Sequence, residues 1–106
     1  MKEKRTRKEI FYDDEIGWAE IYKVPEHPNR VWLRASYYLD LSKSGNYRKT
    51  LDTVYDIFLM LEEAGFKEIY CYAESQSAFN FNERLGFESI NECVPSLGIE
   101  FMKRVF

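Results

Sequence analysis

The sequence predicts a single α/β domain on a mixed sheet, with an antiparallel meander, one parallel strand-helix-strand crossover and two helices. Side chains alternate between apolar and polar over residues 9–40, the period lengthens to that of a helix over residues 45–65, and an apolar run at residues 69–73 precedes a second capped helix. A chain of 106 residues supports one hydrophobic core. We assign residues 9–106 to that domain and residues 1–8 to a basic N-terminal arm.

The alternating segment divides into three strands joined by two turns. Residues 10–12 start the first strand, residues 13–17 form a turn, and residues 18–23 alternate as a second strand. A proline-bounded turn at residues 25–29 leads to a long third strand at residues 31–40. Large side chains on both sides of that strand are typical of a central strand that is covered on both faces.

The first helix is predicted from apolar residues at steps of three and four. These residues are Leu51, Val54, Tyr55, Phe58 and Leu61. Ser44 or Asn46 can cap its start, and Gly65 can supply the residue after its last turn. Because residues 69–73 then read as a buried strand, the unit should form a right-handed parallel crossover.

The second helix is short and has signals at both ends. Ser75 can act as its N-cap, and Gly86 can adopt the left-handed conformation that ends a helix. Residues 88–93 and 99–106 then alternate again, and we expect these two strands to finish the sheet side by side.

The strand, helix and Gly-Phe sequence at residues 69–87 resembles the C-terminal half of the GCN5-related N-acetyltransferase family. That family has Asn-x-x-Ala followed by Tyr-x-x-x-Gly-Phe, and this chain keeps Ala78, Leu85, Gly86 and Phe87 in register. Ser75 stands where the family often has Asn, and Asn82 stands where it often has the Tyr that reprotonates the coenzyme A thiolate. Since the family normally begins with a strand and two helices, the resemblance implies an abridged acetyltransferase-like fold.

The resemblance places a pyrophosphate loop for acetyl-CoA between the third strand and the first helix. Lys43, Arg48 and Lys49 lie at a helix start, where cations are unfavourable unless an anion offsets them. The family's loop has more than one small residue, whereas this one has only Gly45, and Arg48 would crowd the phosphates. A surface loop with solvated cations is the alternative. The implied cofactor-binding residues are Leu39, Leu41, Lys43, Ser44, Gly45, Asn46, Tyr47, Arg48, Lys49 and Ser75.

The resemblance also implies a gap between the carboxyl ends of two strands, flanked here by Asp40 and Glu74. Either carboxylate could take a proton from an amine if burial raises its pKa, and an amide of Asp40 or Leu41 would polarise the acyl carbonyl. Alternatively, Asp40 ends a strand in a turn and Glu74 is a carboxylate at a helix N-terminus. Asn82, at the third catalytic position, cannot donate a proton, so water or Tyr47 would have to replace the family's Tyr.

Two functions follow from the resemblance. The first is acyl-CoA-dependent N-acyltransfer with weakened or lost activity. The second is a non-catalytic structural or interaction module of the same fold, such as an internal or tail-associated component of a phage virion. Fold alone does not choose between these classes.

Charge and aromatic content bear on partners. The first eight residues carry a charge of +4 and the remainder −7, which argues against a nucleic-acid surface and allows the arm to dock on an acidic neighbour. Without the two helices, part of an aromatic set should be exposed, as at an interface: Phe11, Tyr12, Trp18, Tyr22, Trp32 or Tyr38. We therefore expect a homo-oligomer or a subunit of a larger assembly.

Metal, disulfide and membrane functions are not indicated. The chain has one histidine, His27, and its cysteines, Cys71 and Cys93, lack the paired spacing of a metal site. Two reduced thiols fit a cytoplasmic protein, or a virion-associated one if phage-encoded. No apolar run is long enough to span a bilayer.

Overall fold

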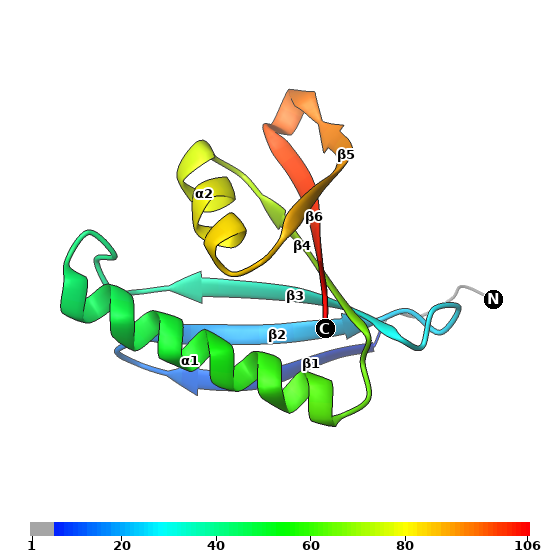
Figure 1. Ribbon diagram of the computed structural model, residues 1–106, viewed down its shortest axis with the longest axis horizontal. Helices are drawn as coiled ribbons and strands as arrows, with labels where there is room; N and C mark the ends of the chain where they lie inside the picture. The colour runs from blue at the N-terminus through cyan, green and yellow to red at the C-terminus, as the bar shows by residue number, and fades with distance from the viewer. Residues whose placement is uncertain (1–5) are drawn as a thin grey trace.

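The computed structural model describes residues 6–106, which form one six-stranded mixed sheet with two helices (Figure 1). The strand order is β1-β2-β3-β4-β6-β5. The strands are β1 (Thr6–Asp13), β2 (Gly17–Lys23), β3 (Arg30–Tyr37), β4 (Glu68–Ala73), β5 (Glu88–Val94) and β6 (Ile99–Val105). The helices are α1 (Ser44–Glu63) and α2 (Gln76–Arg84), and a single 3₁₀ turn spans Pro95–Leu97.

The topology confirms the predicted fold class. β1, β2 and β3 form the antiparallel meander, and α1 connects β3 to β4, which pair in parallel. β6 pairs antiparallel with both β4 and β5, so the last two strands lie side by side as expected.

Two predicted boundaries differ from the structure. The first strand begins before residue 10, so Arg7 and Lys8 of the basic arm belong to β1, while residues 1–5 lie outside the described residues. The third strand ends at Tyr37 rather than Asp40. The chain turns there because Asp40 bonds locally, its Oδ1 accepting from the Ser42 amide at 3.0 Å and from the Ser42 hydroxyl at 2.7 Å.

The α2 caps follow the prediction, whereas the α1 start does not. The Ser75 hydroxyl oxygen accepts from the Ala78 amide at 3.1 Å, and Gly86 has a φ of 96°. α1 instead begins after Lys43, whose side chain makes no capping bond, so the predicted caps Ser44 and Asn46 are wrong. The Asn46 side chain donates to the Asp40 carbonyl oxygen at 3.3 Å and is not available for capping.

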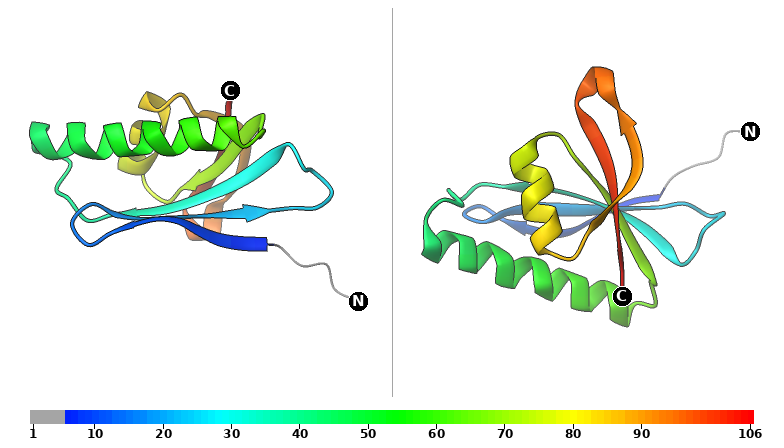
Figure 2. Two further views of the ribbon diagram at one scale, coloured as in Figure 1. Left: turned by 90° about the horizontal axis from the view of Figure 1, so that it is seen from below. Right: turned by 45° about the horizontal axis from the view of Figure 1, so that its top comes forward.

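Both helices lie on the same face of the meander (Figures 1 and 2). The core between this face and the helices is apolar and buried; its largest fully buried apolar side chains are Ile69, Met102 and Val31. Phe58 of α1 packs edge-on against Phe87 at 5.8 Å between ring centroids, which joins α1 to the segment after α2.

The other face of the sheet carries no helix among residues 6–106, and we call it the open face. Alternation places on it Trp18, Tyr22, Trp32, Tyr70, Tyr72 and Phe101. These rings partly cover one another: Trp32 lies 5.3 Å from Tyr70 and 5.7 Å from Phe101 between centroids. No helix of the described part has the length and apolar character needed to cross a membrane.

Candidate active site at a strand opening

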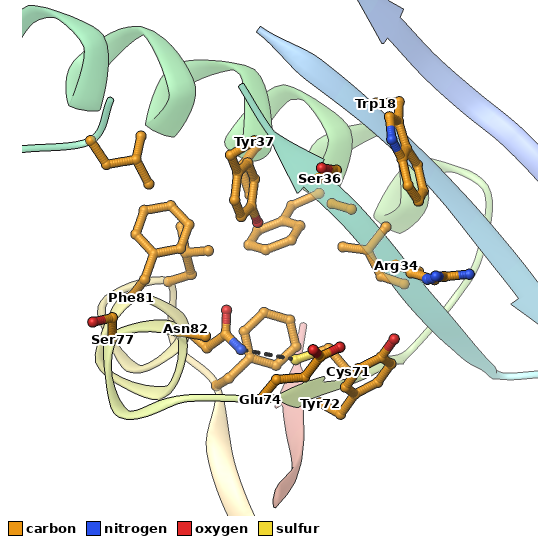
Figure 3. Close-up of a pocket in the computed structure, with 18 residues that line it drawn as sticks. Trp18, Arg34, Ser36, Tyr37, Cys71, Tyr72, Glu74, Ser77, Phe81 and Asn82 are labelled. Atoms are coloured by element: carbon orange, nitrogen blue, oxygen red, sulfur yellow. Dashed lines mark hydrogen bonds between the residues drawn. The ribbon is translucent and has the colours of Figure 1, made fainter. Parts of the chain in front are cut away.

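The sheet separates between the carboxyl ends of β3 and β4. These strands form only three parallel residue pairs, from Arg30 with Glu68 to Trp32 with Tyr70. Farther along, β3 pairs only with β2, and β4 pairs only with β6. A cavity of about 430 Å³ occupies the separation, and we call this cavity the strand opening (Figure 3). Its volume lies in the range of small-molecule sites, which is about 300–1,000 Å³.

Residues from both faces of the sheet line the strand opening. Leu33, Ala35 and Tyr37 of β3 lie on the helix-covered face, together with Cys71 of β4. The open face contributes Trp18, Arg34, Ser36 and Tyr72. α1 and α2 close one side with apolar residues, including Val54, Phe58, Ala78 and Phe81. A ligand in this space would therefore contact the helices at one end and the open face at the other.

Asn82 lines the strand opening from α2. Its Nδ2 lies 3.6 Å from Cys71 Sγ and 3.6 Å from Met102 Sδ. Burial raises the pKa of the Cys71 thiol to about 12, so at neutral pH this group is protonated and is a poor nucleophile. Asn82 thus lines the cavity, and its side-chain contacts there are sulfur atoms.

Of the two candidate bases, only Glu74 lines the strand opening. It follows β4 directly and is exposed, which leaves its carboxylate accessible to an incoming molecule (Figure 3). Asp40 lies outside the lining, in the turn that follows β3. Hydrogen bonds from Ser42 lower the Asp40 pKa, which makes this carboxylate a weaker base.

The amino end of α1 has unpaired amides. The N–H groups of Ser44, Gly45 and Asn46 precede the first helical bond, from the Tyr47 amide to the Lys43 carbonyl, and have no hydrogen-bond acceptor among residues 6–106. A side chain at Gly45 would meet nothing within 4 Å, so the fold itself does not require glycine there. These amides and the positive end of the helix dipole form a place that favours an anion.

The cationic residues of this region differ in their bonding. Lys49 forms an ion pair with Glu15, which raises the Lys49 pKa. Lys43 and Arg48 are exposed and have no carboxylate partner within residues 6–106. Arg48 lies in the second turn of α1 rather than in a loop, so it is the helix, not a phosphate loop, that fixes its position.

Of the remaining residues predicted to bind the cofactor, some line the strand opening and others do not. Leu41 lines the strand opening, whereas Leu39 is half-buried outside it. The Tyr47 hydroxyl accepts a hydrogen bond from Arg84 Nη1 at 3.3 Å, and its ring packs on Phe81 at 5.9 Å; Tyr47 does not line the cavity. Ser75 is used as the α2 cap.

The sequence interpretation missed Tyr37, the last residue of β3, whose hydroxyl points into the strand opening (Figure 3). Its ring packs edge-on against Phe81 at 5.2 Å, the side chain is 37% exposed, and its partial desolvation raises the pKa of the phenol. One signal was available: Tyr37 shares the parity of Leu33 and Ala35, so its side chain lies on the same face of β3 as theirs. A strand end placed at residue 40 concealed that Tyr37 lies at the opening.

The arrangement is that of the N-acetyltransferase fold. PaiA N-acetyltransferase from Thermoplasma acidophilum, solved in complex with coenzyme A, superposes with a TM-score of 0.61 and 18% identity over 86% of this chain and 54% of its own. A chimera of the spermidine N-acetyltransferase SpeG from Vibrio cholerae and hSSAT gives 0.62 and 16%, over 85% of this chain and 58% of its own. A SpeG variant from Vibrio cholerae gives 0.58 and 16%, over 95% and 65% respectively.

These similarities establish the fold. No model of a protein family matches the sequence, and no curated protein matches it. The chain spans 54% to 58% of the first two acetyltransferases above, so the activity of those complete proteins is not transferred by the superposition.

Proposed function

We propose that this domain binds acyl-CoA and transfers the acyl group to an amine. The strand opening is the observation that carries the proposal. Past Trp32, the edge of β3 that faces β4 has no ladder partner among the described residues, so backbone N–H and C=O groups are available to a ligand that carries amides. The pantetheine arm of acyl-CoA is such a ligand.

The amino end of α1 suits the phosphates of the same molecule. Its unpaired first-turn amides and the exposed cations Lys43 and Arg48 would face a diphosphate, and Leu41 connects this helix end to the strand opening. Because Lys49 is occupied by Glu15, fewer cations are available than the sequence suggests. We therefore expect weak binding, with a dissociation constant of about 10–100 μM.

In this proposal, the chemical role of the protein is to remove a proton from the attacking amine. Acyl-CoA supplies the acyl group as a thioester. When the amine nitrogen attacks its carbonyl carbon, a carbon–nitrogen bond forms, the carbon–sulfur bond breaks, the nitrogen loses a proton, and coenzyme A leaves as a thiolate that takes a proton from water. Glu74 is the accessible carboxylate of the strand opening and would accept that proton directly or through water. The acceptor would enter from the open face, between Trp18 and Tyr72.

Calorimetric titration with coenzyme A tests the proposal. Lys43→Ala and Arg48→Ala should each weaken binding by about 1 kcal/mol, since each removes a cation near the phosphates. Lys67→Ala is the matched control, because Lys67 is an exposed cation beyond the opposite end of α1. The absence of any heat of binding at millimolar coenzyme A would overturn the proposal. An equal loss of affinity in all three variants would show that the phosphates do not bind at the amino end of α1.

A second candidate is a non-catalytic interaction module of the same fold. The open face favours it, because aromatic rings gather there without a covering helix in residues 6–106. This candidate is selected if the titration shows no binding and the protein associates with itself or a partner.

A further inference from the structure

We propose that Tyr37 and Asn82 form a polar clamp across the strand opening that binds one amide group of the acyl-pantetheine arm. Asn82 Oδ1 would accept from the amide N–H, and the Tyr37 hydroxyl would donate to its C=O. The inference rests on the proposed function and gives the asparagine a binding role where a proton donor was expected.

The contacts of Asn82 set the orientation of its amide. Met102 Sδ has no proton and can only accept, so the side of the amide that faces it at 3.6 Å must be Nδ2. Nδ2 also lies 3.6 Å from Cys71 Sγ. Oδ1 is thereby directed into the strand opening (Figure 3), and no donor within residues 6–106 is bonded to it. An unpaired acceptor inside a largely apolar cavity favours a ligand N–H.

Tyr37 supplies the complementary donor from the opposite wall. Its ring is fixed by the edge-on contact with Phe81 at 5.2 Å, and its hydroxyl faces Asn82 across the cavity (Figure 3). No hydrogen-bond partner of this hydroxyl exists in the described part of the chain. A phenol already keeps its proton at neutral pH, and partial desolvation of Tyr37, which is 37% exposed, raises its pKa further, so the hydroxyl remains a donor.

A secondary amide matches this pair better than other ligand groups. A secondary amide has an N–H donor and a C=O acceptor on opposite sides. These match the Asn82 acceptor on one wall of the cavity and the Tyr37 donor on the other. A phosphate has no N–H for Asn82 Oδ1, and an ammonium group has no acceptor for the Tyr37 hydroxyl. Val54, Phe58 and Leu85 line the same cavity, so an amide entering it would lose hydration and needs both bonds.

Calorimetry on variants that remove one polar group each tests the clamp. Tyr37→Phe and Asn82→Leu should each weaken coenzyme A binding about three- to tenfold, the usual effect of one net hydrogen bond. Neither should change the affinity for adenosine bisphosphate, a fragment of coenzyme A that lacks the pantetheine arm. Tyr38→Phe is the control, because Tyr38 is 48% exposed and does not line the cavity.

The outcomes separate the clamp from the proposed function. If wild-type protein binds coenzyme A and both variants bind it equally well, the clamp is refuted and the function stands. If wild type binds only adenosine bisphosphate, the clamp is refuted and the anion site stands; if it binds neither, both proposals fail. NMR on wild type covers variants that do not fold: the Asn82 side-chain NH₂ resonances should shift with coenzyme A and stay unmoved with adenosine bisphosphate. Unmoved resonances in both titrations would refute the clamp.

Discussion

Arg104 Nε donates a hydrogen bond to the carbonyl oxygen of Leu85 at 2.9 Å. Leu85 caps the C-terminus of α2, where carbonyl groups have no partner within the helix. The Arg104 guanidinium also lies over the Phe58 ring, 4.9 Å from its centroid. One β6 side chain thus connects the end of α2 to α1, and α2 in turn holds Asn82 at the strand opening.

Gly86→Ala should destabilise the protein by about 1–2 kcal/mol, because Gly86 has a φ of 96° and side chains other than glycine's are strained there. The added Cβ would also lie 2.9 Å from Arg104 Nε and disturb its bond to Leu85. Urea denaturation measures the change. Gly45→Ala is the control: nothing lies within 4 Å of that Cβ, and alanine is a better helix residue, so stability should hold or rise. Equal midpoints for the two variants would contradict the prediction.

Local signals predicted the ends of α2 correctly because the atoms that satisfy them are close in sequence. Ser75 bonds three residues ahead, and Gly86 and Phe87 donate back to Glu83 and Asn82, each at 3.0 Å. These bonds depend on no distant element. The fold class followed similarly from periodicity, which reports only which face of each element is buried.

The site was predicted less completely because it depends on contacts between distant residues. In the sequence, the alternation of side chains typical of a strand continues through residues 38–40. In the structure, Asp40 accepts hydrogen bonds from Ser42 in a turn, so β3 ends earlier and Asp40 lies outside the cavity. From the sequence alone, Lys49 was predicted to contribute a cation to an anion site. In the structure it forms an ion pair with Glu15, which is distant in sequence. Tyr37 lies at the opening because β3 separates from β4 before it. The point of separation depends on both strands together, so it could not be predicted from either segment alone.

Thr50→Val should stabilise the protein by about 1 kcal/mol. Thr50 is 0% exposed, and its Oγ1 has no hydrogen-bond partner, so valine removes an unsatisfied group at nearly constant volume. Thermal and urea unfolding measure the gain. Thr53→Val is the matched control, because the Thr53 hydroxyl donates to the Lys49 carbonyl at 3.0 Å and should be neutral or costly to remove. A loss of stability in Thr50→Val would show that the hydroxyl is bonded in solution.

Asp13→Asn should reduce the loss of stability in acid. Asp13 Oδ1 accepts from the amides of Glu15 at 2.8 Å and Ile16 at 3.0 Å, and the Ile16 bond is the larger cause of a lowered pKa. A carboxylate whose folded pKa is depressed stabilises the fold above its unfolded value, near 3.8, and the contribution is lost as pH falls through the folded pKa. Melting temperatures from pH 6 to pH 2 should therefore fall less in this variant than in wild type. An identical decline in both would contradict the assignment.

The two cysteines should differ in reactivity toward a thiol reagent at pH 8. Cys93 is exposed, whereas Cys71 is buried and its thiol pKa is raised to about 12. Native protein should show one fast thiol, and denatured protein two. Cys93→Ser should remove the fast phase entirely. Rapid labelling of the native Cys93→Ser protein would mean that the strand opening is far more hydrated than the cavity indicates.

Self-association is the last expectation, and the open face is its proposed surface. Tyr12 lies opposite Trp18 in the β1–β2 register, so it belongs to the open face, and it is 63% exposed. The basic residues at the start of the chain and the acidic remainder favour a second copy as the partner, with a contribution that salt screens. Light scattering across a salt series should show dimers or larger species that decrease as salt rises.

Two tyrosine variants, one on each face of the sheet, test whether self-association uses the open face. Tyr12→Ser should reduce it, whereas Tyr55→Ser should not, because Tyr55 is 42% exposed on α1, which covers the other face of the sheet. Equal effects of the two changes would point to general loss of hydrophobic surface rather than to the open face. A monodisperse species of 12.7 kDa at high concentration and low salt would rule out self-association, and the open face would then require a different partner.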